Sequence, residues 1–187
     1  MEKPALRIAA LAVGIVLLAI TGVGAQISDD LELKGQLQKL FPNAASFSGK
    51  SGTPATYRAF GPAPAGSEGE LLGFAYWTTE LEPLERGFDG PIKMLVGLDT
   101  TGKLTGVLVT DHREPYGYFS VELPEFTEQF ESKSIRDPFK VGADVDAITR
   151  ATITVTSASR AIRNASRKVA RAYLTPPSPP ATPTAAQ

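Results

Sequence analysis

The spacing of apolar and polar residues predicts β-strands in the first half of the chain. Residues 56–60 form a short alternating run, and residues 70–78 form a longer one that contains Phe74 and Tyr76. Trp77, the only tryptophan, interrupts the alternation of the longer run. We therefore expect both faces of that strand to be covered by other parts of the protein.

Two strongly apolar runs, residues 92–98 and 104–110, are predicted to form a β-hairpin. Residues 100–103 between them have the composition of a tight turn, in which Gly102 supplies a positive φ. Residues 132–141 are expected to form a loop or a short strand.

Helical spacing predicts three helices. The first covers residues 28–40 with Ser28 as its N-cap, and the second covers residues 123–130 with Pro124 in its first turn. The third covers residues 157–173, behind a cluster of Ser and Thr that is typical of an N-cap. Together with the strands, these helices predict an α+β fold: a small, largely antiparallel sheet with packed helices.

The third predicted helix is amphipathic. Its inward face is expected to contain Ala158, Ala161, Ile162, Ala165, Val169, Ala172 and Tyr173. Its basic face contains Arg160, Arg163, Arg167, Lys168 and Arg171. Such a helix can bind a membrane or nucleic acid. Because the apolar face is rich in alanine, we expect instead that this face packs inside the protein and that the basic face is solvated.

The N-terminal segment resembles an export signal. Lys3 and Arg7 precede residues 8–25, which carry no charge. Residues 1–25 are thus predicted to be either a signal peptide or a membrane anchor. Both alternatives place the rest of the chain outside the cytoplasm, which in a bacterium is the periplasmic side of the inner membrane.

The remaining boundaries follow from composition. Residues 26–40 are expected to form a short helix or spacer, residues 41–174 the folded domain, and residues 175–187 a disordered tail rich in Pro, Ala and Thr.

Composition excludes several kinds of chemistry. The 187-residue chain has a net charge of −1, so bulk charge does not point to nucleic acid. It contains no cysteine, which excludes disulfides, iron–sulfur clusters and thiol catalysis. His112 is the only histidine, which excludes a zinc site built on several histidines. We predict no metal site and no catalytic residue, and any redox chemistry requires an organic cofactor.

Residues 144–157 are rich in hydroxyl groups and run directly into the third predicted helix. A helix cap is the simplest interpretation. A second interpretation is an anion site, because the free N–H groups and the dipole of a helix N-terminus favour a phosphate there. A threonine at that point could hold a phosphate, even as a covalent ester.

Residues 146–152, Asp-Ala-Ile-Thr-Arg-Ala-Thr, resemble the flavinylation motif of the FMN-binding domain family, whose members include NosR, NqrC and RnfG. The resemblance extends over residues 41–174 and includes the stretches 87–92, 95–107 and 111–116. It is stronger for NosR-like proteins, and it implies an FMN-binding-domain-like fold behind one hydrophobic segment.

The resemblance implies covalent FMN, attached through a phosphoester to Thr152 by a flavin transferase. The protein would then be an exported flavoprotein that transfers electrons between redox partner proteins, including membrane-bound ones. The implied cofactor-binding residues are Thr152, Asp146, Thr149, Arg150, Ala151, His112, Glu114 and Tyr116. His112 also fits a structural or solvated role, and Tyr116, Tyr118 and Phe119 fit either flavin stacking or the core.

Arg150 departs from the family motif, which has glycine at this position. A positive φ there would cost an arginine roughly 1–2 kcal/mol. The arginine could obstruct the transferase, or it could contact the FMN phosphate. The alternative hypothesis is therefore a flavin-free domain that acts as a binding or scaffold subunit of a membrane or redox complex. A hydrolase that uses His112 is disfavoured, because no nucleophile elbow accompanies it.

Overall fold

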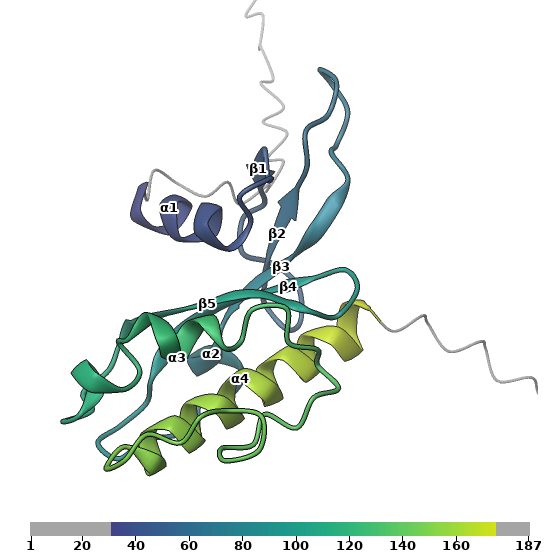
Figure 1. Ribbon diagram of the computed structural model, residues 1–187. Coiled ribbons are helices and arrows are strands. Elements are labelled where there is room, and N and C mark those ends of the chain that lie inside the picture. The colour runs from purple at the N-terminus through teal and green to yellow at the C-terminus, as the bar shows by residue number, and fades with distance from the viewer. Residues whose placement is uncertain (1–30, 175–187) are drawn as a thin grey trace, which may run out of the picture.

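The computed structural model describes residues 31–174 (Figure 1). The predicted signal or anchor at residues 1–25, the Ser28 cap and the tail at residues 175–187 lie outside this range. The elements in chain order are α1 (Leu31–Leu40), β1 (Ser46–Phe47), β2 (Tyr57–Phe60), β3 (Leu71–Trp77), α2 (Thr78–Leu81), β4 (Lys93–Asp99), β5 (Leu104–Asp111), the 3-10 helix η1 (Gly117–Phe119), α3 (Pro124–Glu128) and α4 (Thr152–Tyr173). Among these elements, none combines the length and the apolar character that a membrane-crossing helix requires.

Within the described residues, five strands form one antiparallel sheet in the order β1-β2-β3-β4-β5. The predicted α+β fold and the hairpin of β4 and β5 are therefore confirmed. Val96 faces Val107 across the hairpin, and Gly102 in the connecting turn has φ +85°. That conformation costs a glycine little, which explains the tight turn.

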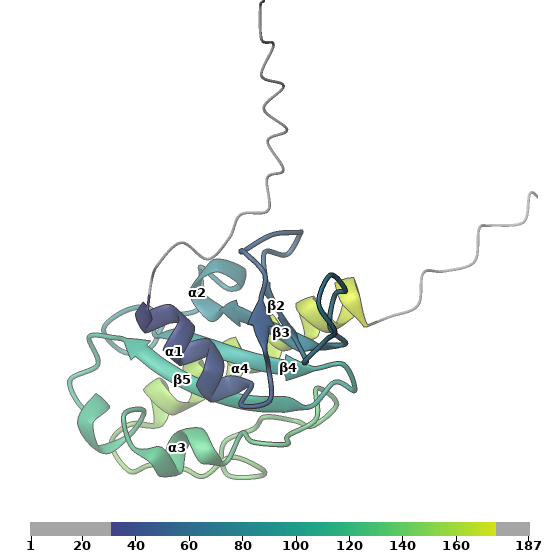
Figure 2. The same ribbon diagram turned by 90° about the horizontal axis from the view of Figure 1, so that it is seen from above.

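Each face of the sheet is covered by helices (Figures 1 and 2). Helix α1 lies across one face, where Leu37 and Leu40 pack on Trp77 and Leu95. Helices α3 and α4 cover the other face and form the larger core. That core includes Tyr76, Met94, Val96, Phe126, Phe130, Val155 and Ile162. The neighbours Tyr76 and Trp77 thus enter opposite cores, which confirms that both faces of β3 are covered.

Helix α4 begins at Thr152, five residues before the predicted start at Ser157. The predicted Ser/Thr cap is wrong, because Ala151 is the N-cap residue and no side chain caps the helix. Threonine and valine have low intrinsic helix propensity, but packing overrides it here. Val155 is fully buried in the larger core, so the chain must already be helical at that point.

The inward face of α4 contains Ala158, Ala161, Ile162, Ala165 and Val169, as predicted. Ala172 is instead exposed. The short helix α2 was not predicted, because Thr78 reads from the sequence as the end of a strand.

The basic face of α4 is more than a solvated surface. Arg167 donates hydrogen bonds to the carbonyls of Ile135 (2.8 Å) and Asp137 (2.9 Å). Lys168 donates to the carbonyl of Leu81 at 2.7 Å and pairs with Glu82 at 2.7 Å. These cations therefore fasten the loop at residues 135–137 and the C-terminal end of α2 to α4, and the prediction of a merely solvated face is wrong for them.

Candidate functional site

A pocket with a volume of about 280 Å³ opens at the N-terminus of α4. It is lined by Phe88, Pro115, Tyr116, Arg150, Thr152, Ile153 and Thr154. These residues come from three segments: the loop before β4, the loop after β5, and the first turn of α4 together with Arg150, two positions before that helix. The pocket brings together three of the residues predicted from the motif, namely Thr152, Arg150 and Tyr116.

Thr152 is exposed at the first position of α4. Its side-chain hydroxyl has no hydrogen-bond partner within residues 31–174. The first intrahelical bond runs from the N–H of Val155 to the carbonyl of Ala151 (2.9 Å). The N–H groups of residues 152–154 therefore have no partner inside the helix, and no side chain caps them. This combination suits an anion held beside the Thr152 hydroxyl.

Arg150 has φ +71°, in the left-handed region that favours glycine. The glycine position of the flavinylation motif thus corresponds to a real conformational requirement of this turn. The chain reaches the conformation with arginine in place. Arg150 is exposed at the edge of the pocket, and its side chain has no carboxylate partner in the described part of the chain. Its guanidinium is therefore free to contact an anion.

Glu114 is buried and connects the segments that form the pocket. Its two carboxylate oxygens accept backbone N–H groups from Phe88 and Asp89, each at 2.9 Å. One of these oxygens also accepts a hydrogen bond from the hydroxyl of Thr154. Gly87 passes so close to this carboxylate that a Cβ atom there would collide with it. Glu114 thus holds the loop of Phe88 against α4 and does not line the pocket itself.

His112 lies behind the pocket and not in its wall. Its Nδ1 accepts the N–H of Glu114 at 3.1 Å, and its Nε2 lies 3.1 Å from Oε1 of Glu122. The ring packs so tightly against Gly117 that no side chain fits there. This geometry corresponds to the structural alternative for His112, in which the ring holds the loop after β5.

The remaining predicted residues also lie outside the pocket. Asp146 and Thr149 are exposed, and Ala151 is buried at the start of α4. Tyr118 meets Phe119 edge-on at 4.8 Å, and Phe119 packs on the larger core. Of the three aromatic residues after Pro115, only Tyr116 lines the pocket.

Sequence reasoning did not single out Phe88, Ile153 or Thr154. Phe88 is 68% exposed and Ile153 is 59% exposed, so both offer apolar surface at the mouth of the pocket. The aromatic residue between Gly87 and Gly90 was a signal for Phe88. No sequence signal marks Thr154, whose role depends on a contact with Glu114 across 40 positions of the chain.

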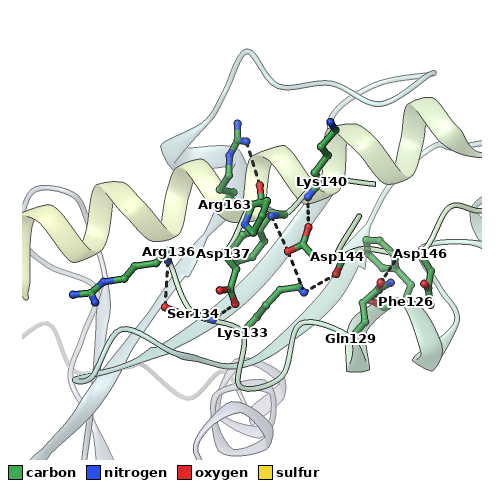
Figure 3. A network of polar contacts seen from close by, with 12 residues as sticks. Phe126, Gln129, Lys133, Ser134, Arg136, Asp137, Lys140, Asp144, Asp146 and Arg163 are labelled. Carbon is green, nitrogen blue, oxygen red and sulfur yellow. Dashed lines mark hydrogen bonds and ion pairs between the residues drawn. The ribbon is translucent and has the colours of Figure 1, made fainter. Parts of the chain in front are cut away.

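A polar network fastens the loop that leads into the motif (Figure 3). Asp144 accepts the N–H groups of Phe139 (3.0 Å) and Lys140 (2.6 Å), and Oδ2 of Asp144 lies 3.3 Å from Nζ of Lys133. Partial burial alone would raise the pKa of Asp144, but these N–H donors and Lys133 hold it below its ordinary value. Nearby, the N–H of Asp146 donates to Oε1 of Gln129 at 2.8 Å.

Comparison with known proteins supports a flavin-related site. The family profile described as the FMN-binding domain matches residues 87–167, a range that contains every residue of the pocket lining. The resemblance to this family is therefore confirmed.

The curated relatives that match this chain are, by name, subunits of an ion-translocating oxidoreductase complex. The protein from Vibrio vulnificus (strain YJ016) is 32% identical over 88 residues, which cover 42% of this chain and 42% of the relative. The protein from Pseudomonas aeruginosa (strain UCBPP-PA14) is 34% identical over 91 residues, which cover 43% of this chain and 42% of the relative. The chain thus matches less than half the length of these relatives. The stronger likeness to NosR-like proteins stays a prediction.

Proposed function

Since residues 87–167 match the FMN-binding domain family, we propose that this protein carries FMN on Thr152 and transfers electrons between redox partners. The observation that carries the proposal is the Thr152 hydroxyl at the N-terminus of α4, which has no hydrogen-bond partner among residues 31–174 and lies where no side chain caps the helix. FMN, when bound, supplies the capacity to accept and return one or two electrons. All other properties of the site come from the residues of this chain.

The phosphate end of the site is supported by charge and by backbone donors. In the proposed ester, Oγ1 of Thr152 loses its proton and bonds to the phosphorus of an FMN donor, while the bond from that phosphorus to the donor's leaving group breaks. Threonine and FMN are thereby joined with the net loss of one water. The N–H groups of residues 152–154 and the positive end of the helix dipole then face the remaining phosphate oxygens. Arg150 adds a mobile positive charge at the edge of the pocket.

The ring end of the site is supported by exposed apolar groups. Phe88, Tyr116 and Ile153 line the pocket and are 68%, 45% and 59% exposed. Flat aromatic surface of this kind favours a stacked ring system. A volume of about 280 Å³ is small for a ligand pocket, so the flavin would be only partly enclosed. A partly exposed ring suits transfer of electrons to a docked protein.

The proposal includes the partners implied by the resemblance. A flavin transferase forms the ester, because a threonine hydroxyl is a poor nucleophile without activation. The redox partners belong to a membrane complex, as the names of the curated relatives suggest by analogy. The predicted export segment would place the domain on the periplasmic side of the inner membrane.

The second candidate is a flavin-free domain that serves as a scaffold within a complex. Arg150 in the glycine position is the observation that favours it. Its steric argument is weakened by the structure, since Arg150 already adopts the positive φ of the motif. What remains in favour of this candidate is obstruction of the transferase by the arginine side chain.

The test is the intact mass of the full chain after co-expression with a flavin transferase and export. Wild type is expected to gain the mass of FMN less one water, and Thr152→Ala is expected to gain nothing. Thr156→Ala is the matched control, because Thr156 is a partly exposed hydroxyl near the start of the same helix, outside the motif at residues 146–152 and outside the pocket lining. It should be modified like wild type.

Two results would contradict the proposal. An unmodified wild-type chain, made beside a second acceptor protein that the same transferase does modify, would favour the scaffold candidate. A modification that persists in Thr152→Ala would place the ester on a residue other than Thr152.

A further inference from the structure

A second hollow lies at the opposite end of α4, and we call it the basic groove. It has a volume of about 640 Å³ and lies between the turn at residues 100–103, the loop at residues 134–136 and the last turns of α4. Lys103, Arg136, Arg167 and Arg171 line it, and no acidic residue does. The chain as a whole has a net charge of −1, so this positive charge is a local feature.

Within residues 31–174, three of these four cations lack a partner. In the described part of the chain, the side chains of Lys103, Arg136 and Arg171 make no hydrogen bond and no ion pair. Figure 3 shows Arg136 extending away from the polar network beside it. Elsewhere Lys50, Lys133, Arg160 and Lys168 each pair with a carboxylate. Lys34, Lys39 and Arg58 are also unpaired among the described residues, but they do not line the groove, which gathers three such cations in one hollow.

Asp99 and Asp137, which adjoin the lining segments in sequence, are engaged by the backbone. Asp99 accepts the N–H groups of Thr101 and Lys103, each at 2.8 Å, and Asp137 accepts the N–H of Ser134 at 2.8 Å. These aspartates reduce the local field, but neither reaches a cation of the groove. The two aspartates therefore stabilise the turns beside the groove, and they do not neutralise its cations.

The walls of the groove are held in place. The guanidinium of Arg167 is fixed by the carbonyls of Ile135 and Asp137. Ile135 and Leu174 pack on the larger core and are only partly buried, so they add apolar surface to the lining. A fixed hollow that combines unpaired cations with apolar surface matches an extended chain that combines carboxylates with apolar side chains.

We propose that the basic groove docks an acidic peptide segment of a partner protein. Its concave shape favours a peptide over the broad surface of a lipid bilayer. Arg171 lies nineteen positions after Thr152 along α4, a distance of roughly 28 Å at about 1.5 Å per residue. The bound segment therefore does not touch the pocket at Thr152, and the groove serves assembly. This role holds whether or not Thr152 carries FMN.

The test measures the affinity of the full chain, kept in neutral detergent, for a fluorescein-labelled peptide of repeated Glu-Glu-Leu units. Lys103→Glu, Arg136→Glu and Arg171→Glu are combined in one variant. The control variant combines Lys34→Glu, Lys39→Glu and Arg58→Glu, which are exposed, equally unpaired among the described residues, and outside the groove. Both variants change the net charge equally.

The groove variant should bind the peptide at least about tenfold more weakly, as three lost ion pairs imply, while the control stays within about twofold of wild type. A Gln-Gln-Leu peptide should not bind, and added salt should weaken binding of the acidic one. An alanine set at the same three groove positions should weaken binding too. Unchanged thermal unfolding of each variant shows that the fold is intact.

Other outcomes overturn the proposal. Equal losses in the groove and control variants would mean that net charge alone attracts the peptide. If the Gln-Gln-Leu peptide bound as tightly as the Glu-Glu-Leu peptide, the carboxylates would not be the groups that the groove recognises. Failure to bind the peptide, with groove-dependent co-flotation on phosphatidylglycerol vesicles, would identify a lipid surface in its place.

Discussion

Arg150 determines how much conformational free energy the turn before α4 requires. At φ +71° an arginine loses roughly 1–2 kcal/mol relative to ordinary backbone, and glycine escapes this strain but loses about 0.5–1 kcal/mol of chain entropy. Arg150→Gly should therefore raise the free energy of unfolding by about 0.5 kcal/mol, and Arg150→Val should lower it by about 1 kcal/mol. Urea denaturation measures both. A clear loss of stability in the glycine variant would contradict a positive φ at this residue.

Glu114 is expected to matter more for stability than any residue of the pocket wall. Glu114→Gln keeps the shape but removes the charge that accepts the N–H groups of Phe88 and Asp89. We expect the free energy of unfolding to fall by about 2–3 kcal/mol, because hydrogen bonds to a buried charge are strong. In addition, the NH2 group of glutamine would point toward one of the backbone N–H donors. Urea denaturation measures the loss, and faster hydrogen exchange at the two amides would locate it.

The control for this change is Glu125→Gln in the first turn of α3, where the side chain is exposed. Unchanged exchange at Phe88 and Asp89 in Glu114→Gln would show that another contact holds the loop.

The sequence motif pointed to Thr152 and Arg150, which line the pocket, because a motif is a short contiguous stretch that can be recognised without tertiary structure. It also led to Tyr116 through the stretch after β5. It did not show that Glu114 faces inward, since its partners Phe88 and Thr154 lie 26 and 40 positions away. Which side of a loop faces a pocket depends on tertiary packing, and that information is absent from local sequence.

At the scale of elements, strands were predicted better than helix ends. The hairpin of β4 and β5 follows from two apolar runs and a glycine turn, which are local signals. The start of α4 depends on Val155 meeting the larger core, a contact between distant elements. Local propensity therefore placed the start of α4 too late, at Ser157, where the hydroxyl-rich segment ends.

The loop of residues 132–146 should respond to acid through Asp144. The folded protein holds the pKa of this carboxylate below its ordinary value of 3.8, so its contribution to stability is complete well above 3.8. That contribution is lost as the pH falls through the lower folded pKa. Asp144→Asn should lower the free energy of unfolding by about 1–2 kcal/mol at pH 7. It should also make that free energy depend less on pH in the acid range.

Urea denaturation at a series of pH values from 7 down to 3 measures the effect of Asp144→Asn. Asp111→Asn is the control, since Asp111 is exposed and its side chain has no partner among residues 31–174. A difference between wild type and Asp144→Asn that stays constant over the whole series would contradict titration of Asp144 as the cause.

At the scale of the molecule, the folded unit is larger than the family match. Helix α1 precedes residues 87–167, yet Leu37 is fully buried between α1 and the sheet. Leu37→Ala should lower the free energy of unfolding by about 2–5 kcal/mol. Because β3 contributes Tyr76 to one core and Trp77 to the other, both cores should unfold together.

Near-ultraviolet circular dichroism of Trp77 and amide exchange in α4 report the two cores separately. Coincident transitions in Leu37→Ala are expected, with Leu31→Ala as the exposed control. If the amides of α4 kept their full protection from exchange in Leu37→Ala, the core beneath α1 would unfold independently of the larger core.

The simple order of the strands also has a consequence for the rate of folding. Each strand pairs with its neighbour in sequence, so the sheet assembles through short loop closures, which are fast. Helix α4 packs on β3 and β4 only after a long intervening chain has been closed. Val107→Ala in the hairpin should therefore slow refolding, whereas Val169→Ala in α4 should mainly speed unfolding. Stopped-flow kinetics of the two variants would reveal whether the helix docks last.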